Sequence, residues 1–217
     1  MTSNVPSAAS LPLERATLVR RGLRLNYLTI GYNTLEAVGS IAAGVVAGSV
    51  ALIGFGVDSV IEVTASAAAQ WRLRSDGDTA RRERVERLSH RVIGVSFLAL
   101  ATYVAYDSAT ALWYRDQPER SLPGVAILVL SVLVMPVLAR AKRRVARALG
   151  SGALEADATQ TSLCAYLSVI ALVGVGLNAA FGLWWADPVS ALAMVPIIGK
   201  EGLEGVRGEA ECECHGP

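Results

Sequence analysis

The chain has 217 residues, of which 53% are hydrophobic, and its formal net charge at pH 7 is +1. The mean hydropathy of +0.42 excludes an ordinary soluble domain of this length and favours an integral membrane protein. A nucleic-acid-binding role is also disfavoured, because the basic run from 72 to 91 has only Trp71 at its edge and no aromatic residues between its arginines.

Long charge-poor segments predict the fold class, an all-α integral membrane protein with six transmembrane helices. A helix needs ~20 apolar residues to cross the hydrocarbon core, and the two longest segments each hold two such lengths. We expect Gly48 and Ser49 to turn the first pair of helices, and the stretch from Trp184 to Pro188 to turn the last pair. The predicted spans are 25–46, 50–71, 90–113, 122–141, 158–181 and 185–204.

The positions of the basic residues predict the orientation. Of the 20 Lys and Arg residues, all but Arg115 and Arg120 precede the first span, lie between spans two and three or four and five, or close span six. The run from Arg140 to Arg147 is expected to fill the loop between spans four and five. By the positive-inside rule, both termini lie in the cytoplasm. The expected parts are a partly disordered cytoplasmic segment (1–24), the six-helix transmembrane domain (25–204) and a short cytoplasmic tail (205–217).

Acidic residues inside the first two spans are the main functional signal. Between Arg24 and Arg72 the only charged residues are Glu36, Asp58 and Glu62. Asp58 and Glu62 are four residues apart, so their carboxyl groups face the same way, ~6 Å apart along the helix. One charged side chain at mid-membrane costs roughly 2.5–3.5 kcal/mol on insertion scales. A stacked pair without a basic partner therefore indicates a cation held inside the bundle.

Span five offers a second pair of candidate ligands, Gln160 and Cys164, which also share a helix face. A cysteine thiolate binds Zn²⁺ and similar ions well, whereas glutamine offers a neutral carbonyl oxygen. Each also has a structural interpretation: the cysteine as a small packing residue, the glutamine as an interhelical hydrogen-bond partner. Set against the acidic pair, they would complete a four-residue metal site.

Three further polar residues are candidates for a path or a proton relay. Glu36, with Asn33 three residues before it, can line the path, relay protons or hydrogen-bond a neighbouring tyrosine or threonine on its own helix. Asp157 can flank the cytoplasmic mouth near Arg147, or equally cap the fifth helix. These alternatives stay open at the level of the sequence.

The end of the chain carries a compact group of soft ligands, Cys212, Cys214 and His215. Such a group can capture a metal ion and pass it to the cytoplasmic mouth, although it is incomplete as a closed site. The alternative is an acidic, disordered tail with incidental cysteines. The thiols are expected to be reduced, since three cysteines cannot form a conventional disulfide framework.

Several motifs resemble the cation diffusion facilitator family of transporters. The segment 47–52, followed by Asp58 and Glu62, is similar to span two of that family, and segments 151–158 and 187–192 are similar to the starts of spans five and six. The resemblance covers nearly the whole membrane region. It implies a divalent-metal site built by spans two and five, and a homodimer that exchanges metal for protons.

The chain departs from the family pattern at three places. Gln160 and Cys164 stand where zinc-transporting members usually have histidine and then aspartate, and Glu62 replaces a second aspartate. Only a short tail follows span six, so the chain resembles a short form without the usual cytoplasmic C-terminal domain. Proton exchange could run through the carboxylates or Cys164, whose protonation competes with metal binding.

The sequence and the resemblance together predict a divalent heavy-metal cation transporter in the cell (cytoplasmic) membrane. It would export Zn²⁺ first, with Cd²⁺, Co²⁺ or Ni²⁺ as alternatives, by proton antiport, as a homodimer and without a permanent cofactor. The rival hypothesis is a non-transporting membrane metal sensor or assembly partner that uses the same cluster or the tail. An enzyme is not expected, because neither histidine lies in the interior of a span: His90 stands at the start of the third and His215 is in the tail.

Overall fold

The computed structural model describes residues 10–74 and 79–207, and within these ranges it consists of six α-helices joined by short connections. All six predicted helices are confirmed. Three of them are much longer than their predicted spans: the first begins at Ser10 rather than Leu25, the third begins at Thr79 rather than His90, and the fourth continues to Leu149. The helices are α1 (Ser10–Ala47), α2 (Val50–Arg74), α3 (Thr79–Tyr114), α4 (Leu122–Leu149), α5 (Gly152–Phe181) and α6 (Ala186–Arg207).

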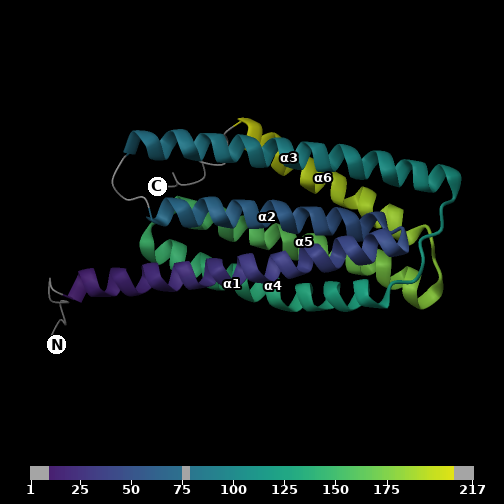
Figure 1. Cartoon of the computed structure of the whole chain (residues 1–217), viewed down its shortest axis with the longest axis horizontal. Helices are drawn as coiled ribbons and strands as arrows, with labels where there is room; N and C mark the ends of the chain where they lie inside the picture. Colours follow the sequence, from purple (N-terminus) through teal and green to yellow (C-terminus); the bar gives the residue numbers. More distant parts are fainter. Residues whose placement is uncertain (1–9, 75–78, 208–217) are drawn as a thin grey trace, which may run out of the picture.

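The helices run side by side along the long axis of the molecule, and successive helices run in opposite directions (Figure 1). α1 packs on α2 and α4, and α5 packs on the same two helices, so these four helices close a ring. We call this ring the four-helix bundle. α3 and α6 pack chiefly on each other and attach to the bundle through α2 and α5. The interior of the bundle is therefore the place where side chains of α1, α2, α4 and α5 meet.

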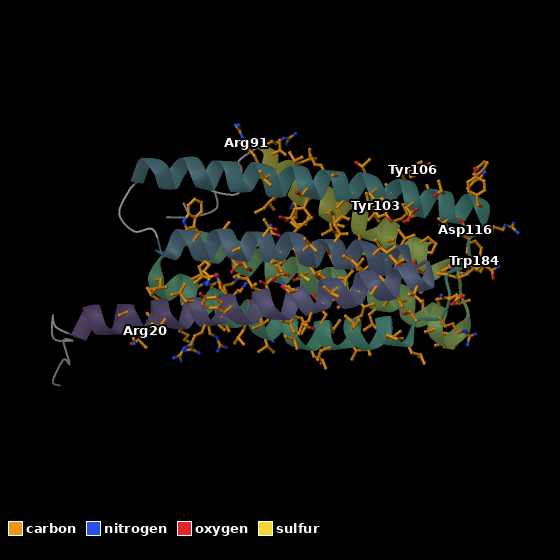
Figure 2. All side chains as sticks on the ribbon, in the orientation of Figure 1. Arg20, Arg91, Tyr103, Tyr106, Asp116 and Trp184 are labelled. Carbon is orange, nitrogen blue, oxygen red and sulfur yellow. The ribbon has the colours of Figure 1, made fainter. Side chains whose placement is uncertain are left out.

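Five of the described helices, α1 to α5, contain stretches long and apolar enough to cross a membrane. α6 does not reach that standard alone, because its second half carries Lys200, Glu201, Glu204 and Arg207. The two ends of the molecule differ in character (Figure 2). Arg20 and Arg91 lie toward one end, and Asp116 and Trp184 lie at the other.

The predicted turn at Gly48 and Ser49 is confirmed, and Gly48 has the positive φ of 64° that glycine adopts without steric cost. The last turn differs from the prediction, because Asp187 and Pro188 belong to the first turn of α6, and Gly182 ends α5 with a φ of 68°. The Asp187 carboxylate accepts hydrogen bonds from the Ser49 hydroxyl and from a backbone N–H at the start of α2. This contact fastens the first turns of α2 and α6 together.

The predicted basic loop between spans four and five is wrong. The residues from Arg140 to Arg147 continue α4, and only Gly150 and Ser151 separate it from α5. Arginine, lysine, alanine and leucine are strong helix formers, so the end of the apolar span does not end the helix. α4 ends instead where Gly150 adopts a left-handed conformation and its N–H bonds the last turn.

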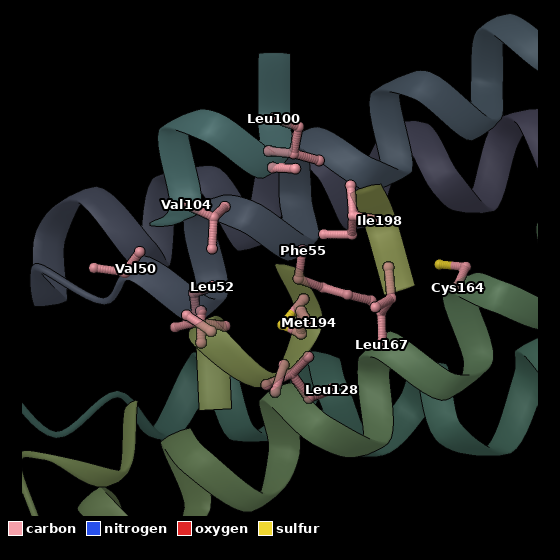
Figure 3. Close-up of a cluster of buried hydrophobic side chains, with 14 of the residues drawn as sticks. Val50, Leu52, Phe55, Leu100, Val104, Leu128, Cys164, Leu167, Met194 and Ile198 are labelled. Atoms are coloured by element: carbon pink, nitrogen blue, oxygen red, sulfur yellow. The ribbon is translucent and has the colours of Figure 1, made fainter. Parts of the chain in front are cut away.

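Large apolar side chains from five of the helices gather in one buried cluster (Figure 3). Leu52 and Phe55 from the first half of α2 meet Leu128, Leu167 and Met194, all fully or almost fully buried. The cluster reaches the buried Cys164 of α5 at its edge.

Candidate metal-binding site

Two acidic residues of α2 are stacked inside the bundle. Asp58 is 3% exposed and Glu62 is 2% exposed, and both lie in the stretch of α2 that can span a membrane. As the sequence predicts, a spacing of four places their carboxyl groups on one helix face. Asp58 Oδ2 and both carboxylate oxygens of Glu62 have no hydrogen-bond partner among the described residues. Carboxylate oxygens that are buried in this way are suited to hold a cation.

α5 brings a thiol to the same place. Cys164 is buried, and the carboxyl groups of Asp58, Glu62 and Glu36 are all close enough to act electrostatically on it. Gln160 is only partly buried. The buried positions of α5 instead recur through Asp157, Thr161 and Cys164, at the spacing of three and four that marks one helix face.

Glu36 of α1 joins this group more directly than the sequence indicated. Its Oε2 accepts a hydrogen bond from the Ser59 hydroxyl at 2.9 Å, and the Cys164 Sγ lies 3.9 Å from the same oxygen. Three helices, α1, α2 and α5, therefore supply acidic or thiol groups to one region. We call Asp58, Glu62, Cys164 and Glu36 the acidic cluster.

A stripe of polar residues runs along the inner face of α1. Its members recur every three or four positions and are nearly all fully buried; they are Asn26, Thr29, Asn33, Glu36 and Ser40. Neither polar atom of the Asn33 side chain has a hydrogen-bond partner among the described residues. The stripe continues the polar surface of the acidic cluster along the bundle, where Asn33 was predicted to line a path.

A second polar group lies one helical turn from the acidic cluster. The Lys142 ammonium of α4 is fully buried and pairs with the Asp157 carboxylate at 2.8 Å. It also donates to the hydroxyl groups of Ser66 at 3.3 Å and Thr161 at 3.0 Å. Asp157 is thus an inward-facing member of α5 that bonds Lys142, and the helix cap is at Ser151.

Sequence reasoning missed Lys142 because it was assigned to a loop. A signal was present, since Lys142 continues the face of α4 that carries the buried residues Ser131, Met135 and Ala139, at spacings of three and four. The arginines between 140 and 147 lie on other faces of α4. A lysine on the buried face therefore indicates a buried charge that is paired with another group.

The donors are near one another without forming a finished coordination shell. Among the side chains that the structure describes, no three His, Cys, Asp or Glu residues are arranged as a ready metal site. A cation would have to draw the acidic cluster together by changes of side-chain rotamer. The predicted tail ligands Cys212, Cys214 and His215 lie outside the described residues.

The fold and the acidic cluster define a helical membrane protein whose interior carries buried acidic side chains and a buried thiol. Residues 27–208 match the family model of the cation efflux transmembrane domain. The chain therefore belongs to the cation efflux family, as the resemblance of its motifs indicated.

Two curated proteins illustrate the relationship. Protein p34 of Rickettsia prowazekii (strain Madrid E) is 23% identical over 171 residues, which are 76% of this chain and 56% of that protein. Transmembrane protein 163 of Xenopus laevis is 25% identical over 146 residues, or 67% of this chain and 52% of that protein. The chain thus spans about half the length of the curated relatives it matches.

Proposed function

We propose that this protein exports a divalent heavy-metal cation from the cytoplasm, with Asp58, Glu62 and Cys164 as its ligands. One observation carries the proposal: buried carboxylates of α1 and α2 gather around a buried thiol of α5 inside membrane-spanning helices. Family membership supports cation transport as the activity. Gln160, which is partly buried, is assigned an auxiliary place as ligand or hydrogen-bond partner.

The donor set favours Zn²⁺ first, with Cd²⁺, Co²⁺ and Ni²⁺ as alternatives. A thiolate combined with carboxylate oxygens suits borderline and soft divalent ions better than Mg²⁺ or Ca²⁺, which prefer oxygen-only shells. Glu36 adds a further carboxylate, so the site can reach four ligands even if Gln160 remains apart.

Access is proposed from the end of the bundle where the arginines gather. The first half of α2 is apolar around Leu52 and Phe55, and its second half carries the buried polar residues Ser66 and Gln70. With the positive-inside rule, the polar half faces the cytoplasm and both termini lie there. We place the protein in the cell membrane in this orientation.

Proton antiport is proposed as the driving force. Carboxylate and thiol ligands must lose their protons to bind a metal, so binding and protonation compete at the same atoms. Glu36, Asn33 and Asp157 provide further polar groups along the bundle, through which protons can pass. A homodimer and capture of metal by Cys212, Cys214 and His215 are also proposed, on the family resemblance and on the residue types respectively.

Uptake into proteoliposomes with an acidic interior tests the proposal. Purified full-length protein is reconstituted, Zn²⁺, Cd²⁺, Co²⁺ or Ni²⁺ is added outside, and an entrapped metal-sensitive dye reports entry. The expected result is proton-driven uptake that Asp58→Asn abolishes. Asp107→Asn is the matched control, because Asp107 is a partly buried aspartate of α3 that bonds Tyr103 and lies outside the acidic cluster.

The control variant should keep its flux. If folded, inserted protein moves none of the four metals, transport is refuted and the membrane metal sensor or assembly partner becomes the favoured function. If Asp58→Asn transports as well as the unaltered protein, the site is elsewhere even though transport stands.

A further inference from the structure

Lys142 is the one fully buried lysine of the described residues, and its ammonium group has three oxygen atoms close to it. It faces Asp157 Oδ2 at 2.8 Å, Thr161 Oγ1 at 3.0 Å and Ser66 Oγ at 3.3 Å. The two hydroxyl oxygens accept hydrogen bonds from the ammonium group, and the Asp157 carboxylate forms an ion pair with it. Ser66 also donates to the other Asp157 oxygen at 2.6 Å. The charge is therefore held at a fixed place where α2, α4 and α5 meet.

The fixed place adjoins the acidic cluster. On α2, Ser66 comes one helical turn after Glu62, and on α5, Thr161 comes three residues before Cys164. A turn of helix rises ~5.4 Å, so the ammonium group lies about one turn from the proposed ligands. Both Lys142 and Asp157 are close enough to act electrostatically on Glu62.

A positive charge at this distance from a bound divalent cation lowers the affinity of the site for that cation. Charges inside a protein are screened far less than charges in water, so the ammonium group repels a cation that arrives at Glu62. Asp157 acts in the opposite sense, because it offsets the lysine charge. Any coupling of this kind is reciprocal. A bound cation must therefore also make the position of the Lys142 ammonium group less favourable.

Building on the proposed transport function, we infer that Lys142 is a tethered counter-cation of the metal site. Its ammonium group balances the charge of the acidic cluster when no metal is bound and opposes the transported cation when it binds. The lysine thereby keeps the affinity low enough for the cation to leave. Asp157 positions the ammonium group and partly offsets its positive charge.

Titration calorimetry with Zn²⁺ and Cd²⁺ on detergent-solubilised full-length protein tests this inference, with Asp58→Asn as the blank for metal bound by the tail. Lys142→Met keeps the length of the side chain and removes the charge, and should tighten binding on the order of ten-fold. Asp157→Asn leaves the lysine charge unbalanced and should weaken binding by a similar factor. Lys142→Arg and Lys200→Met should bind as the unaltered protein does, the second because Lys200 is exposed and pairs with Glu204.

The opposite signs separate an electrostatic role from a structural one. If Lys142 only held the helices together, both Lys142→Met and Asp157→Asn would weaken binding, and that result overturns the inference. In proteoliposomes, Lys142→Met should lower both the KM and the maximal rate of uptake, because tighter binding slows release. If metal binding is the same in the unaltered protein and in Asp58→Asn, the proposed site itself fails, which is distinguishable from a failure of the lysine alone.

Discussion

Cys164 carries the one sulfur atom in the acidic cluster, and sulfur is a softer metal ligand than a carboxylate oxygen. Cys164→Ser replaces it with a hydroxyl of similar size, and we expect uptake of Cd²⁺ to fall relative to that of Co²⁺ on the order of ten-fold. Parallel uptake measurements for the two metals in the same proteoliposomes give this ratio. An equal loss for both metals would mean that Cys164 acts in packing against Leu167 and its neighbours instead of in metal choice.

Residue spacing predicted which side chains share a face, and much of the candidate site followed from it. Asp58 and Glu62 lie together because a spacing of four fixes that on any helix, and Cys164 is buried beside them. The contact between Glu36 and Cys164 could not be predicted from the sequence. Residue spacing within one helix gives no information on how two helices are aligned along each other. Lys142 was missed for a different reason, since its helix was taken to end before it.

At the scale of the helices, α5 and α6 approach closely at one glycine. A Cβ on Gly174 would lie 1.9 Å from Ser190 Oγ and 2.8 Å from the backbone oxygen of Ala186, whereas a Cβ on Gly176 would meet nothing within 4 Å. Gly174→Ala should therefore push the helices apart and destabilise the protein by about 1–3 kcal/mol. Gly176→Ala, two residues along the same helix, should stabilise it by roughly 0.5–1 kcal/mol.

Thermal unfolding of both variants in detergent, followed by circular dichroism, checks this pair. Equal melting temperatures for Gly174→Ala and Gly176→Ala would show that α6 can move away from α5 at no cost. That outcome would also mean that the contact at Ser190 does not hold α6 in place.

The existence of the helices could be predicted, and their ends only in part. Apolar length identified all six, because each needs a stretch that can cross the hydrocarbon core. Charge marks where a span leaves the membrane, yet it does not break a helix, which is why α4 runs on through Arg147 to Gly150. α6 shows the converse, since its helix is present although its composition alone does not reach that of a span.

For the molecule as a whole, the orientation in the membrane is the property that remains to be measured. We expect the ends of α1 and α6 and the α4–α5 turn to face the cytoplasm. Arg147 and Asp116 are both exposed, so a cysteine can be introduced at either position in a protein whose Cys212 and Cys214 are replaced by serine. The two cysteines should differ in their accessibility to a labelling reagent outside the cell. A membrane-impermeant maleimide should label Asp116→Cys in intact cells, and Arg147→Cys only after the cells are opened. The reverse pattern would invert the proposed direction of access.

The packing of the six helices into a four-helix bundle with an attached pair was not contained in the sequence pattern. Neighbours along the chain do pack together in α1–α2 and α4–α5, but α3 packs mainly on α6, far away in sequence. This arrangement decides which polar faces point inward. It places the acidic cluster inside the ring and leaves the Tyr103 and Tyr106 side of α3 facing outward (Figure 2).

The polar stripe of α1 has a consequence for how the chain is made. α1 leaves the ribosome before α2, and its most apolar window has a mean hydropathy of 1.2, against 2.5 for α4. Before α2 is present, Glu36 lacks the hydrogen bond from Ser59, and neither polar atom of the Asn33 side chain has a partner among the described residues. α1 is therefore poorly suited to stay in lipid alone, since each polar group there is costly. We expect α1 to wait at the insertion machinery until α2 arrives with Ser59, so that the two helices enter the bilayer as a hairpin.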